Sequence, residues 1–230
     1  GEEWDQRLLA QLALPPACMP RIQPMTGLAG RVSDSAARDS SLPAGVPVAV
    51  GAVDGVGSAI GAGVREPGDV MLIHGSSLIL ATPIPPDWPA GADPALMRFP
   101  PLLPPQDLLY TSTPSGAADV FAQALLGAEA LAAERRRICS LPPRPDSSMF
   151  IPHMEGISSP WLNMDMRGAW LGLGPGQDGA ELYRAVLEGM VFSARHILDA
   201  MSESGIPLRT IRLVGGGARS RDLCQLYADI

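Results

Sequence analysis

The stretch "VMLIHGSSLILATPIP", residues 70–85, decides the architecture of this 230-residue chain. Two apolar runs, 70–73 and 78–81, flank the segment His-Gly-Ser-Ser. Short runs rich in Val, Ile and Leu that are joined by a turn-forming segment are typical of antiparallel strands. The sequence therefore predicts a β-hairpin with its turn at residues 74–77.

Helices and strands alternate downstream of this hairpin. The pattern predicts a strand at 107–113, a helix or helix pair at 115–137 with Ser115 as N-cap candidate, a strand at 149–154, a helix at 178–205 that Asp178 caps and Gly205 ends, a strand at 210–214 and a helix from 220 onward. A hairpin followed by this alternation predicts a mixed sheet covered by helices, an α/β arrangement.

The segments around this core are less regular. We expect a short helix within residues 1–20, a connective stretch at 21–44, a strand at 46–50 and a small-residue helix after Asp54. The proline-dense stretch 82–105 is expected to be a surface excursion, because proline donates no hydrogen bond to a sheet.

Composition excludes several classes of function. The formal net charge of −7 argues against a nucleic-acid-binding surface. The absence of lysine excludes a Walker A loop and a Schiff-base lysine within this chain. The three cysteines and three histidines are scattered, so no metal centre or disulfide framework is predicted. No apolar run approaches roughly 18 residues, and we expect a soluble cytoplasmic protein without a membrane partner.

Three glycine-centred turns carry the candidate chemistry: 51–57, 74–77 and 215–217. Each follows a predicted strand, and ligands of α/β sheets collect at the carboxyl ends of strands. Glycine lets backbone N–H groups approach an anion, and a following helix adds its positive end. Each turn taken alone is more often structural, and Asp54 alone is typical of a helix-capping residue.

Taken together, these turns resemble one family, the FGGY carbohydrate kinases. The resemblance lies in "GVPVAVGAVDGVGSAIGAGVREPGDVMLIHGSS" (45–77), "GAWLGLGPGQDGAELYRAVLEG" (168–189) and "IRLVGGGARSRDLCQLYADI" (211–230). It implies an actin/hexokinase-type (ribonuclease H-like) ATPase fold, a mixed sheet flanked by helices. The implied activity is transfer of the γ-phosphate of ATP to a sugar hydroxyl, with Mg²⁺, and a pentulose such as D-xylulose is the favoured acceptor.

The resemblance also implies roles for individual residues. Asp54 matches the general base, and Asp54 and Gly55 would face the sugar. The matching nucleotide-binding positions are Gly75, Ser76 and Ser77 at the phosphates, Gly116 nearby, Gly216 and Gly217 at the adenosine, and Arg221. No metal ligand is assigned. The sequence departs from the family pattern at His74, at 116–126 and at 153–161.

By the same resemblance, residues 1–66 are the tail of an N-terminal sugar-binding domain, and 67–230 are a C-terminal nucleotide-binding domain that is incomplete at its end. The chain alone is then expected to be inactive. Two alternatives stay open: a nucleotide-binding module that acts on no sugar, and a catalytically silent relative. The sequence also leaves the sugar unidentified and the choice between monomer and homodimer open.

Overall fold

The structure is a computed structural model that describes residues 3–84, 87–88, 96–103, 106–140 and 147–230. The chain divides into two compact units, Gly1–Gly57 and Ser58–Ile230. No helix among the described residues has the length and apolar character needed to cross a membrane.

The first unit consists of short elements. It contains α1 (Gln6–Gln11), a 3-10 turn (Pro16–Cys18), β1 (Leu28–Arg31), α2 (Asp34–Ser40) and β2 (Pro47–Ala49), and β1 pairs with β2 in antiparallel fashion. The prediction of a purely connective stretch at 21–44 is therefore wrong. Strand β1 is only four residues long and exposed throughout, so it lacks the alternation by which a strand is found in a sequence. The expected strand within 46–50 and the helix after Asp54, α3 (Asp54–Gly61), are confirmed.

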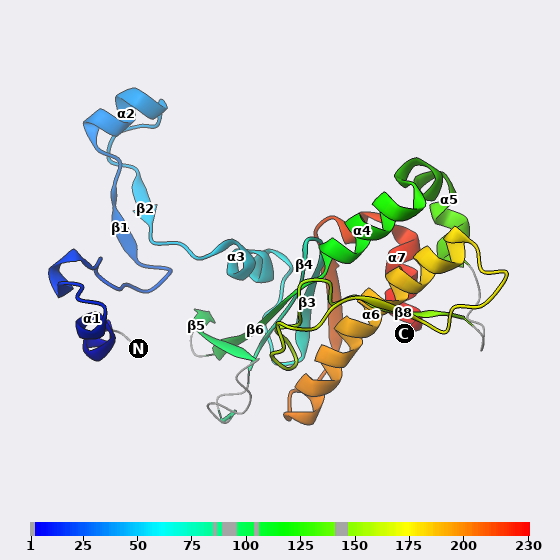
Figure 1. Cartoon of the computed structure of the whole chain (residues 1–230). Coiled ribbons are helices and arrows are strands. Elements are labelled where there is room, and N and C mark those ends of the chain that lie inside the picture. Colours follow the sequence, from blue (N-terminus) through cyan, green and yellow to red (C-terminus); the bar gives the residue numbers. More distant parts are fainter. Residues whose placement is uncertain (1–2, 85–86, 89–95, 104–105, 141–146) are drawn as a thin grey trace. The chain divides into compact units, whose positions relative to one another are not determined.

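A five-stranded mixed sheet forms the centre of the second unit (Figure 1). Its strands are β3 (Asp69–His74), β4 (Ser77–Pro83), β5 (Met97–Leu103), β6 (Gln106–Pro114) and β9 (Thr210–Val214), in the order β5-β6-β4-β3-β9. Strands β3 and β4 pair in antiparallel fashion from Met71 opposite Ala81 to His74 opposite Leu78, which confirms the predicted hairpin. Strand β9 runs parallel to β3.

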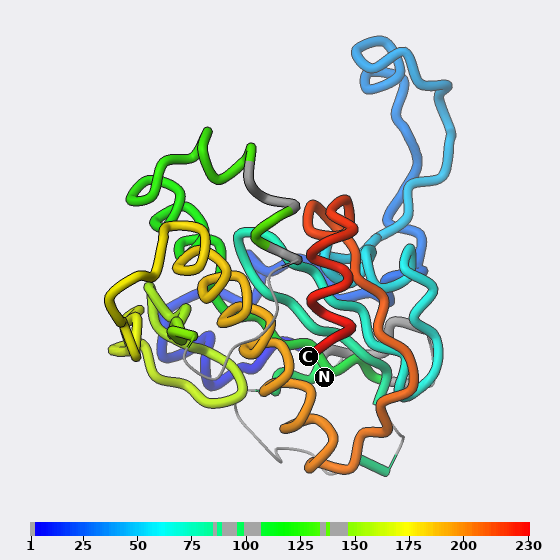
Figure 2. Tube along the Cα trace, turned by 90° about the vertical axis from the view of Figure 1, so that its right-hand side faces the viewer, coloured from blue at the N-terminus to red at the C-terminus, as the bar shows by residue number. Residues whose placement is uncertain are grey.

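The main helices lie to one side of this sheet (Figures 1 and 2). They are α4 (Gly116–Leu126), α5 (Ala128–Ser140), α6 (Gly179–Glu203) and α7 (Arg221–Asp229). The predicted helix pair at 115–137 is confirmed, and it breaks at Gly127, whose φ is +92°. Helix α6 packs on the sheet with its second half through four buried side chains: Ala194, Ile197, Leu198 and Met201. With its first half it packs among α4, α5 and α7.

A third, small sheet packs against helix α6. Strands β7 (Met149–Ile151) and β8 (Ala169–Leu171) pair with Phe150 opposite Trp170. Strand β8 was not predicted, and β7 is shorter than the expected 149–154. The predicted cap at Asp178 is confirmed, and the structure shows it as half of a capping box: Asp178 accepts from the Glu181 amide at 2.9 Å, and the Glu181 carboxylate accepts from the Asp178 amide.

The prediction that residues 82–105 form a surface excursion is wrong for the part of this stretch that the structure describes. Residues 97–103, with two consecutive prolines, form β5 at the edge of the sheet, where proline is tolerated, and the pairing of β5 with β6 is irregular between Phe99 and Leu103, where these prolines lie. Ile84, Trp88 and Leu96 are buried in the core, and the Trp88 indole donates to the Ser204 carbonyl at 3.0 Å. The rest of this stretch, 85–86, 89–95 and 104–105, lies outside the described residues.

Candidate functional site

One end of the large sheet, where β3, β6 and β9 finish, brings together two of the three glycine turns and the start of α4. This end is called the sheet edge below. Ile73 pairs with Val214 at the ends of β3 and β9, so the turns 74–77 and 215–217 leave neighbouring parallel strands side by side. Ser77 pairs with Pro114, which brings the end of β6 and the start of α4 to the same edge. The structure thus brings together the segments 75–77, 115–116 and 215–217.

The hairpin turn is fastened to the start of α4 by hydrogen bonds. The backbone amides of Ser115 and Gly116 both donate to the Ser76 carbonyl, at 3.2 and 2.9 Å. The Ser115 hydroxyl donates to the Gly75 carbonyl at 3.1 Å. Ser115 occupies the N-cap position of α4, as predicted, but its side chain makes no capping bond to the helix. It holds the hairpin instead, which the sequence did not predict.

On the other side, the hairpin rests on the glycine turn through His74. A Cβ at Gly217 would lie 2.8 Å from the His74 Cβ and 3.1 Å from its carbonyl oxygen. Real Cβ atoms do not approach other atoms so closely, so only glycine fits at position 217 with this spacing. The His74 Nδ1 lies 2.7 Å from the Tyr227 hydroxyl of α7.

The glycines at this edge therefore fall into two groups. A Cβ at Gly116 would lie 2.6 Å from the Ser76 Cα, so Gly116, like Gly217, is explained by packing within the fold. A Cβ at Gly216 would meet no atom within 4 Å, and at Gly75 it would meet only the Ser77 carbonyl oxygen at 4.0 Å. Packing within the chain leaves these two exposed glycines unexplained, which is what close approach by a ligand requires.

The groups around Gly75 and Gly216 are suited to bind an anion. Ser76 is exposed beside Gly75, and its hydroxyl is a hydrogen-bond donor. Helix α4 begins directly behind this turn, and the amino end of a helix carries partial positive charge. Arg221 is exposed at the first position of α7, after the 3-10 turn Gly217–Arg219. A glycine turn, hydroxyls and a helix start at one sheet edge form a potential phosphate cradle.

Asp54 and Gly55 belong to the first unit. Asp54 is the first residue of α3 and is exposed, and its Oδ1 accepts from the Gly55 amide at 2.7 Å. This bond goes to the next residue, whereas a helix-capping side chain accepts from the amides two or three residues further on, so it is not a capping bond. The roles of Asp54 and Gly55 toward a sugar stay predictions.

The residues described do not supply a metal centre. Nowhere among them do three His, Cys, Asp or Glu side chains gather as ligands would. Mg²⁺ at a phosphate site is held by one or two carboxylates together with the phosphates themselves, and no described residue is assigned to it.

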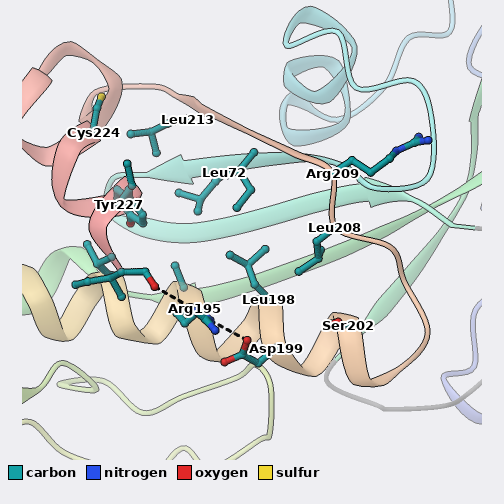
Figure 3. A pocket seen from close by; sticks show the side chains of 15 residues that line it. Leu72, Arg195, Leu198, Asp199, Ser202, Leu208, Arg209, Leu213, Cys224 and Tyr227 are labelled. Atoms are coloured by element: carbon teal, nitrogen blue, oxygen red, sulfur yellow. Dashed lines mark hydrogen bonds and ion pairs between the residues drawn. The ribbon is translucent and has the colours of Figure 1, made fainter.

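A pocket of about 720 Å³ lies away from the open glycines, between β9, α6 and α7 (Figure 3). Leucine side chains from β3, α6 and β9 line it, and the Arg195–Asp199 ion pair, at 2.8 Å, lies at its rim. Tyr227 lines one end of it. The pocket shares no lining residue with the cradle. The candidate site is therefore identified by the open space at Gly75 and Gly216 and not by the size of a cavity.

The segment 153–161, where the sequence departs from the family pattern, packs behind the sheet edge. The Ser158 amide donates to the Thr113 hydroxyl at 3.3 Å, and the Ser158 hydroxyl donates to the Ser112 carbonyl. Burial lowers the pKa of His153, and the nearby His196 adds to the effect. In the second departure, 116–126, Asp119 of α4 accepts from the Tyr183 hydroxyl of α6 at 2.5 Å, a contact that joins two helices.

Comparisons with known proteins identify the family and the fold of the chain. Residues 113–230 match the FGGY family of carbohydrate kinases, C-terminal domain. A glycerol kinase from Gloeobacter violaceus is 28% identical over 238 residues, which cover 99% of this chain and 46% of that protein. The crystal structure of a xyloylose kinase from Brucella ovis superposes with a TM-score of 0.85 at 30% identity, over 98% of this chain and 46% of that one.

A third relative shares the fold at lower identity. Plasmodium falciparum glycerol kinase with ADP has a TM-score of 0.80 at 20% identity, over 98% of this chain and 46% of that one. The chain spans about half the length of the relatives it matches. These structures confirm the expected actin/hexokinase-type α/β fold. Since the family match extends over more than half of the chain, the protein belongs to the FGGY family of carbohydrate kinases.

Proposed function

We propose that the chain supplies the nucleotide-binding part of an ATP-dependent kinase that phosphorylates a hydroxyl of a small sugar or polyol. The observation that carries this proposal is the pair of open glycines, Gly75 and Gly216, at the edge where the packed glycines Gly116 and Gly217 hold two turns together. A ligand with phosphates at one end and a flat ring at the other suits two such turns on neighbouring strands.

The proposed roles follow the two turns. Gly75, Ser76 and Ser77 bind the phosphates of ATP, and Gly216 lets the adenosine approach the backbone. Gly116 and Gly217 act by holding these turns in place, and Arg221 offers a fixed positive charge to the nucleotide. Phosphoryl transfer depends mostly on positioning and on stabilising the charge of the phosphates. Mg²⁺ supplies part of that stabilisation when bound.

The acceptor hydroxyl is proposed to be activated in the first unit, Gly1–Gly57. Asp54 accepts the proton of that hydroxyl as its oxygen attacks the γ-phosphorus, and Gly55 leaves space beside it. We assign residues 1–66 to the tail of an N-terminal sugar-binding domain and 67–230 to a part of the C-terminal nucleotide-binding domain. The acceptor is proposed to be a pentulose such as D-xylulose; the similarity to both a xyloylose kinase and a glycerol kinase makes glycerol the alternative to test.

A phosphorylation screen of the complete gene product tests this proposal. We expect ADP release from ATP to be stimulated at least about tenfold by one of xylulose, ribulose, gluconate, glycerol or erythritol, because closure of the site on the correct acceptor promotes transfer. Coupled ADP detection measures the rate. ADP release that no acceptor stimulates would favour a nucleotide-binding module, and failure to bind ADP in calorimetry would favour a silent relative.

Adjacent glycines on one turn test the nucleotide site directly. Gly216→Ala is expected to keep the melting temperature and weaken ADP binding roughly tenfold, about 1.4 kcal/mol, because Gly216 has α-helical φ and ψ and open space at Cβ. Gly217→Ala is the matched control. It should lower the melting temperature, because its Cβ would overlap His74. Unchanged ADP affinity in a folded Gly216→Ala variant would remove Gly216 from the site.

A further inference from the structure

A histidine and a tyrosine that are 153 residues apart in the chain meet behind the two turns. His74 is the last residue of β3 and directly precedes Gly75. Its Nδ1 lies 2.7 Å from the hydroxyl of Tyr227, and the two rings meet edge to face, with centroids 5.7 Å apart and planes at 82°. The pair therefore joins the hairpin to α7 by a hydrogen bond and a ring contact.

Packing holds the Tyr227 side chain in place for this contact. Its ring packs against both hydrophobic clusters of the second unit, the one among α4–α7 and the one between the sheet and α6. Figure 3 shows it between β3 and α7, beside Leu213. Burial raises the pKa of the Tyr227 phenol above its usual range, so the hydroxyl keeps its proton. A protonated phenol can donate to His74 Nδ1 or accept from it, whichever tautomer is present.

Gly217 also packs against His74. The backbone of the glycine turn passes so close to the His74 Cβ that no side chain fits there. The imidazole is thus bonded to α7, while the backbone of the same residue continues into the phosphate turn. Movement of His74 would change the spacing between Gly75 and Gly216, because its side chain is bonded to Tyr227 of α7 while its backbone leads directly into the hairpin turn.

We propose that His74 is a positioning residue for the nucleotide: its bond to Tyr227 sets the spacing between the 75–77 hairpin and the 215–217 turn, so that both open glycines contact one bound nucleotide. This inference rests on the proposed function and deepens it. His74 touches no reacting atom in this role. It acts through the two turns, so a side chain that cannot bond to Tyr227 would leave their spacing without this constraint.

Four conservative variants of the complete protein test the role. Asn at position 74 places a polar atom near that of Nδ1, whereas Gln places it near Nε2 and Phe keeps only the ring. We expect His74→Gln, His74→Phe and Tyr227→Phe to raise KM for ATP and Kd for ADP about tenfold, with kcat and the acceptor KM within about twofold, and His74→Asn to retain near wild-type values. A purely structural role would instead lower the active fraction and leave KM for ATP unchanged.

Hydrogen exchange gives a readout that needs no activity. In the ligand-free protein, Tyr227→Phe is expected to speed exchange of the Gly75 and Gly116 amides, which are hydrogen-bonded to Ser77 and Ser76, about tenfold. Suppose that the wild-type protein binds ADP, but the variants keep wild-type exchange rates and a wild-type KM for ATP. That result would overturn the positioning role of His74 without touching the proposed function. A wild-type protein that binds no ADP would overturn the proposed function and the nucleotide role of His74 with it.

Discussion

Asp54→Asn is expected to lower kcat of the complete protein by about 10³-fold, because a positioned general base contributes roughly 10²–10⁴-fold to a proton transfer. Asparagine has nearly the same shape and keeps an oxygen that can accept from the Gly55 amide, the bond that Asp54 makes at 2.7 Å. The substitution removes the charge and the proton-accepting capacity while the start of α3 keeps its local structure. The rate of acceptor phosphorylation at saturating substrates measures the effect.

Binding measurements separate chemistry from folding in this experiment. Acceptor and ADP affinities of Asp54→Asn should stay within about threefold of wild type, since an interaction needed only in the transition state lowers kcat without weakening substrate binding. Asp39→Asn, at another exposed aspartate of the same unit, is the matched control and should retain full activity. Turnover of Asp54→Asn close to the wild-type rate would remove Asp54 from the proposed role.

Gly189→Ala is expected to cost about 3 kcal/mol of the free energy of unfolding, the upper range for overpacking of a close-packed core. Gly189 lies inside α6, where alanine ordinarily stabilises a helix by about 1 kcal/mol over glycine. Here the sign is reversed, because a Cβ would lie 2.2 Å from the Phe150 carbonyl oxygen of β7. Backbone, rather than a flexible side chain, would have to move.

Chemical denaturation measures this effect against a control on the same helix. At Gly179, the first residue of α6, the nearest atom to an added Cβ is the Leu126 Cδ2 at 3.9 Å, an ordinary contact. Gly179→Ala should therefore leave the midpoint unchanged or slightly raised. Equal midpoints for the two alanine variants would show that β7 does not press on α6 at Gly189.

The sequence predicted the local elements of the second unit well, because their signals are local. The hairpin at 74–77 follows from two apolar runs and a short turn, and α6 follows from three-to-four spacing with an N-cap at Asp178. The same reasoning missed β1 and β8, which are four and three residues long. Strands so short are defined by their partners, and the partner is not visible in a local pattern.

Which glycines are structural could not be predicted in the same way. All four of Gly75, Gly116, Gly216 and Gly217 follow a strand and match the family pattern, so they look alike in the sequence. Only the packing separates them: Gly116 and Gly217 have backbone or a neighbouring Cβ where a side chain would go, whereas Gly75 and Gly216 face open space. The bond between His74 and Tyr227 was equally hidden, since a single aromatic residue on an amphipathic helix indicates only core packing.

By itself, the sequence determined the order of helices and strands, the places where glycine turns follow strands, and the family, since these depend on residue types at short, fixed spacings. The tertiary structure alone decided that β9 lies parallel to β3, that a proline-containing segment pairs as the outermost strand of the sheet, and that two of four glycines stay open. The first and last of these outcomes depend on contacts between residues about 140 positions apart, such as Ile73 with Val214 and His74 with Gly217, and contacts at such separation form only when the whole unit packs.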